Sequence, residues 1–177
     1  MPRIDQYTPE RIADRMMIQD CMYRWCRAID RLDFDGIRAV FHPDAIDLHG
    51  SYKGGIEGLI DWIRSRHTGV RFSMHQVTNM LIEFVTPDLA FVEAYVQTTQ
   101  RYTPEGSAAL SQLLGGGGGR HNLGVDFYSD SRYADRFERR NGEWRIAHRT
   151  LIQEWKQVYP VTPESPTLKA EHLVGRR

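Results

Sequence analysis

The sequence lacks an excess of charge of either sign. Lysine and arginine together number 23 among its 177 residues, and so do aspartate and glutamate. A nucleic-acid or anionic-membrane partner requires a basic surface, so this balance argues against both. No apolar run approaches the ~20 residues that cross a bilayer, and residues 1–10 are polar, without the apolar centre of a signal peptide. We therefore expect a cytoplasmic protein.

Cysteine is scarce as well. The chain has two cysteines, Cys21 and Cys26, and both fall within a segment of helical pattern. Residues five apart on a helix point in different directions, so we expect free thiols that pack inside the fold rather than a disulfide. No zinc-binding spacing is present. The cysteines therefore give no reason to expect a zinc site.

The chain does show a change of pattern halfway along. Thr8 and Pro9 form a helix start, and the helix runs to about Arg31. Its apolar stripe comprises Ile18, Met22, Trp25 and Ile29. Further helices are predicted at about residues 34–41 and 56–66, with a short strand at 45–49. Strand-like segments, bounded by turn signals, cover residues 72–85, 90–102, 126–139 and 143–155.

Helices followed by a run of antiparallel strands predict a single α+β domain with its core at about residues 8–158. A strongly curved antiparallel sheet can wrap around the long N-terminal helix and leave a cone-shaped cavity. Residues 104–121 contain five consecutive glycines, which disfavour regular structure. We predict a mobile loop there, either a plain connection between strands or a lid over a pocket. Repeated prolines predict an extended arm at residues 159–177.

Three segments carry a recognisable order of residues. An acidic residue, Asp30, stands near the end of the long helix, and an Asp-Ala pair follows at residues 44–45. A strand then carries His75 and Asn79 in the spacing H-x-x-x-N, and residues 132–149 read as a closing hairpin. Together these segments resemble the SnoaL-like branch of the nuclear transport factor 2-like superfamily. This resemblance implies a cone-shaped α+β barrel.

The resemblance also implies a chemistry. Enzymes of this branch include dehydratases, a dehydrochlorinase and a formaldehyde-releasing lyase, which act without metal or organic cofactor. Carried over to this chain, His75 is the base that removes a proton, Asp30 orients it, and Arg149 assists the leaving group. Dehydratases of the branch often carry tyrosine where this chain has Trp25, and Tyr23 is a possible replacement. The resemblance further implies a homo-oligomer, with a trimer favoured over a dimer.

The residue types fit this chemistry. Histidine has an ordinary pKa of about 6.5, which suits a base at neutral pH. A carboxylate bonded to the other ring nitrogen fixes the tautomer and stabilises the imidazolium. Helical spacing places Asp30 and Tyr23 toward the same side, and strand alternation places His75 and Asn79 on one face. Simpler alternatives are a solvated Asp30, a packed His75, and an Arg149 that forms an ordinary ion pair with Asp135 or Glu154.

Aromatic side chains favour an aromatic substrate, because rings stack and phenol hydroxyls bind oxygen substituents. The predicted substrate-binding residues are Tyr23, Trp25, Tyr52, Asn79, Tyr95, Tyr128 and Tyr133. The leading hypothesis is a cofactor-independent lyase that acts on a small, aromatic molecule. The alternatives are a non-catalytic scaffold, as in the β subunits of ring-hydroxylating dioxygenases, and a small-molecule-binding protein.

Overall fold

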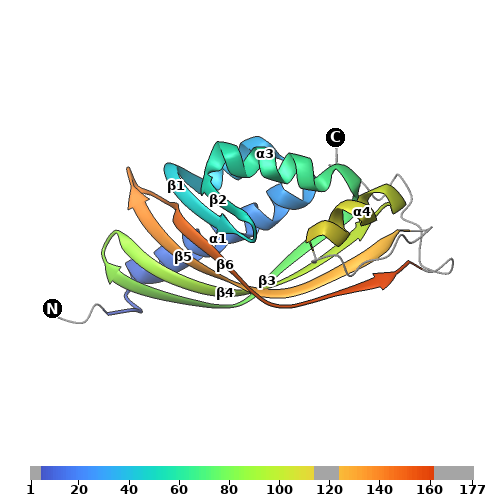
Figure 1. Ribbon diagram of the computed structural model, residues 1–177. Coiled ribbons are helices and arrows are strands. Elements are labelled where there is room, and N and C mark those ends of the chain that lie inside the picture. Colours follow the sequence, from blue (N-terminus) through green and yellow to red (C-terminus); the bar gives the residue numbers. More distant parts are fainter. Residues whose placement is uncertain (1–4, 114–123, 162–177) are drawn as a thin grey trace.

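The computed structural model describes residues 5–113 and 124–161 (Figure 1). The elements follow in the order α1 (Pro9–Arg31), α2 (Phe34–Val40), β1 (Phe41–His49), β2 (Tyr52–Gly55), α3 (Ile56–Arg66), the 3-10 turn η1 (His67–Gly69), β3 (Val70–Thr86), β4 (Leu89–Tyr102), α4 (Pro104–Leu113), β5 (Val125–Arg140) and β6 (Glu143–Pro160).

The strands form one six-stranded sheet in the order β2-β1-β6-β5-β4-β3. The long strands curve into a trough, and α1 and α3 lie on its concave side (Figure 1). The expected α+β fold, with a curved sheet around the N-terminal helix, is confirmed. Two details differ from the expectation. The pair β1 and β6 is parallel, and the sheet is open, with β2 and β3 at its edges.

Helix α1 begins and ends where the sequence indicates. The side-chain oxygen of Thr8 accepts a hydrogen bond from the amide of Arg11 at 3.3 Å, and Pro9 occupies the first turn. Leu32, in the left-handed conformation with φ of 53°, ends the helix. α1 packs against β3 and β6. Its predicted stripe is fully buried and consists of Ile18, Met22, Trp25 and Ile29.

The prediction of a mobile loop at residues 104–121 is wrong for the first half of this segment, which forms helix α4. Thr103 caps this helix, because its side-chain oxygen accepts from the amide of Gly106 at 3.1 Å. Leu110 is buried in a second apolar cluster beneath α4, which also contains Phe127. The glycine run, and with it the proposed lid, lies outside the described residues. So does most of the predicted C-terminal arm, because β6 continues to Pro160.

Helix α4 is held close to the turn η1. A Cβ atom added to Gly106 would lie 2.7 Å from the Cα of Gly69, so the two backbones touch where side chains would prevent it. The amide of Thr103 also donates to the carbonyl of Gly69 at 2.8 Å. This contact fixes one end of α4 beside the turn that carries His67.

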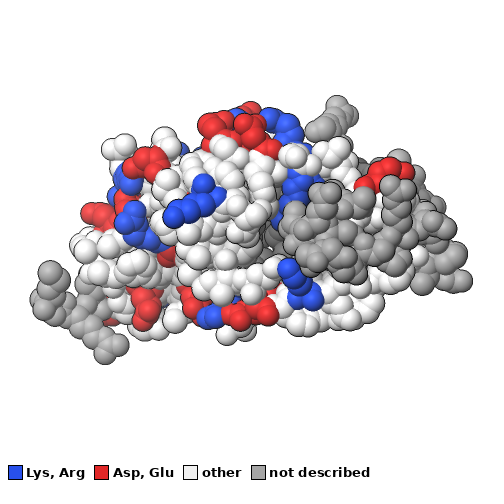
Figure 2. Space-filling view, viewed as in Figure 1, with Lys and Arg blue, Asp and Glu red and all other residues white. Residues whose placement is uncertain are grey.

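The cysteines and the surface agree with the composition. Cys21 and Cys26 are free and buried, as predicted. Figure 2 shows acidic and basic side chains interspersed over the visible face. No helix among residues 5–113 and 124–161 is both long and apolar enough to cross a membrane.

Candidate active site

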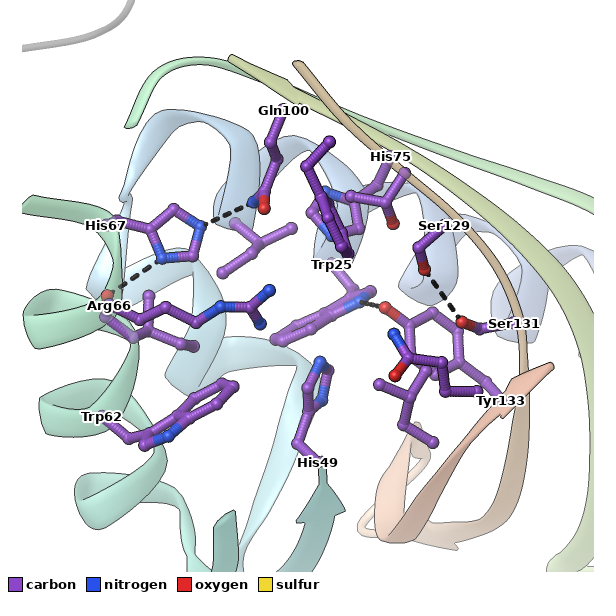
Figure 3. A pocket seen from close by; sticks show the side chains of 16 residues that line it. Trp25, His49, Trp62, Arg66, His67, His75, Gln100, Ser129, Ser131 and Tyr133 are labelled. Atoms are coloured by element: carbon purple, nitrogen blue, oxygen red, sulfur yellow. Dashed lines mark hydrogen bonds between the residues drawn. The ribbon is translucent and has the colours of Figure 1, made fainter. Parts of the chain in front are cut away.

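A pocket lies between α1, α3 and the concave face of the sheet, and sixteen side chains line it (Figure 3). The volume of this pocket that the centres of water molecules can occupy is about 40 Å³. That is room for roughly three waters at ~10–15 Å³ each. Entry of an aromatic ring therefore requires a side chain to move.

His75 and Asp30 meet at the wall of this pocket. Nδ1 of His75 lies 2.7 Å from Oδ1 of Asp30, and the backbone amide of His75 donates to Oδ2 at 2.9 Å. Since the carboxylate accepts, Nδ1 carries the hydrogen and Nε2 presents a lone pair. Nε2 has no hydrogen-bond partner among residues 5–113 and 124–161. The structure therefore brings together the two residues predicted as base and orienting acid.

The carboxylate of Asp30 is held as an anion. Burial opposes its charge, but the hydrogen bonds from His75 and Ser73 outweigh this effect, so the pKa of Asp30 lies below its ordinary value. The Ser73 hydroxyl donates to Oδ1 at 3.0 Å. An anionic Asp30 can stabilise an imidazolium on His75, which is what a general base requires after it takes a proton.

A chain of polar groups continues behind Ser73. The amide nitrogen of Gln100 donates to the Ser73 hydroxyl at 3.3 Å and to Nε2 of His67 at 3.2 Å. Nδ1 of His67 lies 2.9 Å from the carbonyl of Ile63, so it is the donor nitrogen. Both ring nitrogens of His67 are thus engaged, and this pocket histidine is not free to act as a base.

A third histidine, His49 of β1, also faces the pocket (Figure 3). Its Nδ1 lies 3.4 Å from Oδ1 of the fully buried Asp47, beyond a good hydrogen bond. Burial lowers the pKa of His49, and Asp47 opposes this only in part. His49 is therefore a neutral imidazole, and its ring lacks the short contact to a carboxylate that fixes the ring of His75.

Trp25 and Tyr133 line the pocket and contact each other, as Figure 3 shows. Nε1 of Trp25 donates to the hydroxyl of Tyr133 at 3.1 Å. Because an indole can only donate, the tyrosine oxygen accepts, and its own hydrogen remains available. Burial raises the pKa of Tyr133, so its hydroxyl stays protonated at neutral pH. Tyr133 can donate this hydrogen to an oxygen in the pocket.

Arg149 does not reach the pocket, contrary to the expectation that it assists a leaving group. Its side chain is fully buried and binds both carboxylate oxygens of Asp135, at 2.9 and 2.6 Å. Its guanidinium lies 3.9 Å from the centroid of the Tyr133 ring, behind that wall. Burial opposes the charge, but Asp135 outweighs it, so the pKa of Arg149 lies above its ordinary value. Of the two ion-pair partners expected for Arg149 in the simpler alternative, Asp135 is the one that it binds, whereas Glu154 accepts from Arg132.

Five other predicted substrate-binding residues lie outside the pocket. Tyr23, Asn79, Tyr95 and Tyr128 are exposed. The expected strand alternation fails at Asn79, where φ is 45° and the pairing of β3 with β4 shifts register. Tyr52 packs on Trp62 with ring centroids 6.2 Å apart but does not line the pocket.

Sequence reasoning missed several pocket residues, of which His49, Trp62, Arg66 and His67 bear on chemistry. The sequence pattern around these residues is weak, because none belongs to a motif. Each lies at the end of an element or in a helix that was predicted only to pack in the core. The spacing of Trp62 and Arg66, four residues apart on α3, does place both on one helix face. Among the described residues, no group of three or more His, Cys, Asp or Glu side chains is arranged to hold a metal ion.

A curved sheet around a long helix, with a pocket at its concave face, defines the nuclear transport factor 2-like class of α+β proteins. Residues 10–150 match the family model of the SnoaL-like domain, and the chain belongs to this family. No curated protein sequence gives a significant match.

Solved structures share the fold at low sequence identity. Hexachlorocyclohexane dehydrochlorinase LinA-type3 from Novosphingobium barchaimii LL02 is 18% identical with a TM-score of 0.70, over 89% of this chain and 97% of that one. A candidate scytalone dehydratase from Novosphingobium aromaticivorans is 18% identical, TM-score 0.67, over 89% and 97%. A candidate aromatic ring hydroxylase from the same species is 21% identical, TM-score 0.68, over 86% and 96%. These similarities establish the fold.

Proposed function

We propose that the protein is a cofactor-independent lyase that acts on a small aromatic substrate. The observation that carries this proposal is the 2.7 Å contact between His75 and Asp30, which directs Nε2 of the histidine to a pocket lined by aromatic rings. The dehydratase and dehydrochlorinase among the structural relatives support elimination as the type of reaction.

In the proposed reaction, Nε2 of His75 takes a proton from a carbon of the substrate. The electron pair of the broken C–H bond forms a double bond, and the leaving group departs with its own bonding pair as hydroxide or halide. Asp30 stabilises the imidazolium formed. The hydroxyl of Tyr133 donates a hydrogen bond to the departing group, which is the role that the family resemblance implies for Arg149.

A formaldehyde-releasing reaction uses the same groups differently. His75 then takes the proton of a substrate hydroxymethyl group, the carbon–carbon bond breaks as formaldehyde forms, and the electron pair of that bond expels the leaving group. Both reactions need a base with a fixed tautomer, and His75 meets this requirement better than His49, whose nearest carboxylate oxygen is 3.4 Å away. The identity of the products therefore separates the two reactions.

The test compares wild type with His75→Ala and Asp30→Asn on a panel of phenolic alcohols, diarylpropane diols and halogenated rings, with no cofactor added. Products are identified by mass spectrometry. We expect both variants to lose at least about 100-fold in kcat, the usual contribution of a general base. The control is His148→Ala, because His148 lies on β6 but does not line the pocket.

Turnover that survives His75→Ala would overturn the assignment of the base. Absence of turnover by wild type on the whole panel would overturn the proposal of a lyase and favour a scaffold or a binding protein. Circular dichroism and thermal unfolding of each variant establish that a loss of turnover is not a loss of fold.

A further inference from the structure

The charged groups of the pocket are distributed unevenly. Among the sixteen side chains that line it, Arg66 is the one arginine, and none is an aspartate or a glutamate. The nearby carboxylates lie behind the walls: Asp30 is hydrogen-bonded to His75, and Asp47 is fully buried beside His49. A ligand that enters the pocket therefore meets a positive charge and no exposed negative one.

Arg66 occurs in the last turn of α3, and its side chain extends into the pocket (Figure 3). Its guanidinium carbon lies 5.2 Å from the centroid of the Trp62 ring. Arg66 forms no ion pair with any residue that the structure describes, and its buried Nε has no hydrogen-bond partner there. A buried donor without a partner is unfavourable, and a ligand that accepts from it gains the corresponding stabilisation.

Arg64, two residues earlier, shows the ordinary arrangement for the same helix. Its guanidinium pairs with Asp61 at 2.9 Å and lies 4.6 Å from the centroid of the Phe34 ring, and its side chain is 57% exposed. The inward direction of Arg66 is therefore not a general property of this turn. It follows from the position of Arg66 on the helix face that also carries Trp62.

We propose that the pocket binds an aromatic carboxylate, with Arg66 as the residue that binds the carboxylate group. A guanidinium matches a carboxylate through two parallel hydrogen bonds, and Trp62 beneath it can stack on the ring of the ligand. In Figure 3 Arg66 and His75 approach the pocket from different sides. The anionic end of the substrate thus lies toward α3 and the reacting carbon toward β3. Arg66 is also the longest flexible side chain in the small free space, so its movement opens room for the ring.

The inference rests on the proposed function only in using the same pocket, and binding tests it without turnover. The probes are benzoate, phenylacetate and cinnamate, each paired with its neutral primary amide. Titrations at constant ionic strength follow tryptophan fluorescence, to which Trp25 and Trp62 in the pocket contribute, and calorimetry gives the affinities.

We expect at least one carboxylate to bind wild type about tenfold or more tightly than its amide, a difference of roughly 1.4 kcal/mol. Arg66→Gln removes this preference, Arg66→Lys retains part of it, and the matched control Arg64→Gln leaves it unchanged. Equal affinities for acid and amide, an unchanged preference in Arg66→Gln, or no binding of any carboxylate would each overturn the inference. Carboxylate binding through Arg66 without turnover of any substrate would instead contradict the lyase proposal and leave this inference standing.

Discussion

The indole nitrogen of Trp25 donates a hydrogen bond to the hydroxyl of Tyr133 at 3.1 Å, across the wall of the pocket. The rings meet edge to face, with centroids 6.3 Å apart. Dehydratases of the SnoaL-like branch often carry tyrosine at the position of Trp25. In this chain Trp25 instead donates a hydrogen bond to a tyrosine of β5. The pocket therefore gains its phenol from the sheet rather than from the helix.

Replacement of Tyr133 by phenylalanine tests this arrangement. We expect Tyr133→Phe to lower kcat by about 10-fold or more, because the donor to the leaving group is lost, and to destabilise the fold by ~1–3 kcal/mol, because the buried Trp25 N–H loses its acceptor. Steady-state kinetics and urea unfolding measure the two effects. Trp25→Phe retains the phenol, so it should lower kcat less; the reverse order would contradict a donor role for Tyr133.

Asp30 predicts a specific dependence of stability on pH. Its pKa in the folded protein lies below the ordinary value of 3.8, so its ionised form is favoured by folding. The stabilisation by ionised Asp30 is fully present above about pH 5. It is lost as the pH falls through the pKa of Asp30 in the folded protein. We expect the unfolding free energy of wild type to decrease more steeply than that of Asp30→Asn between about pH 5 and 3. If the unfolding free energies of wild type and Asp30→Asn, measured by urea titration, change in parallel with pH, the ionised form of Asp30 is not favoured by folding.

The pair of Arg149 and Asp135 is predicted to act on stability. Arg149→Met leaves the carboxylate of Asp135 buried without its partner, which costs ~3–5 kcal/mol. The double variant Arg149→Met/Asp135→Leu should be less destabilised than the sum of its two single changes. Arg64→Met, at an exposed pair with Asp61, serves as control with an expected effect of ~0–1 kcal/mol. A stable Arg149→Met protein that has lost only turnover would return Arg149 to a catalytic role.

The two cysteines should be unreactive in the folded protein. Burial raises the pKa of Cys21 and of Cys26 to about 12, so almost no thiolate is present near pH 8. We expect a chromogenic disulfide reagent to label neither thiol in the native state and both after denaturation. Rapid labelling of the native protein would indicate that α1 opens at Cys21 or Cys26.

The contact between Gly106 and Gly69 can be tested with one methyl group. Gly106→Ala places a Cβ 2.7 Å from the Cα of Gly69, which requires α4 to shift, and we expect a loss of ~1–3 kcal/mol. The control is Gly55→Ala, where the nearest atom is 4.0 Å away. Unfolding free energies from urea titrations give the comparison. Equal effects of the two substitutions would mean that α4 does not depend on this contact.

The sequence predicted those parts of the fold whose signals are local. The cap at Thr8 and the apolar stripe of α1 placed the longest helix to within a residue. Helix α4 was missed although Thr103-Pro-Glu repeats the Thr8-Pro-Glu start of α1, because the glycine run dominated the interpretation of the whole segment. The parallel pairing of β1 with β6 joins residues about 100 positions apart, and no local pattern reports such pairing.

The site was predicted unevenly for a related reason. His75 and Asp30 could be paired because a family resemblance connects them, whereas their contact spans 45 positions. The leaving-group role of Arg149 came from the resemblance, whereas the alternative, an ion pair with Asp135, is the contact that the β5–β6 register produces. Arg66 and His49 face the pocket because of how α3 lies on the sheet and how β1 pairs within it, and no local pattern predicts either arrangement. Residues from many elements meet at this pocket, and the sequence alone does not give their distances.

The register shift at Asn79 has a consequence for behaviour at high concentration. β3 is a long strand at the edge of the sheet, and an uninterrupted edge of this length would present a continuous ladder of amides and carbonyls to a second copy. The bulge, with φ of 45° at Asn79, breaks that ladder between Thr78 and Leu81. The irregularity that turns Asn79 away from the pocket thus also shortens the regular edge with which a second copy could pair.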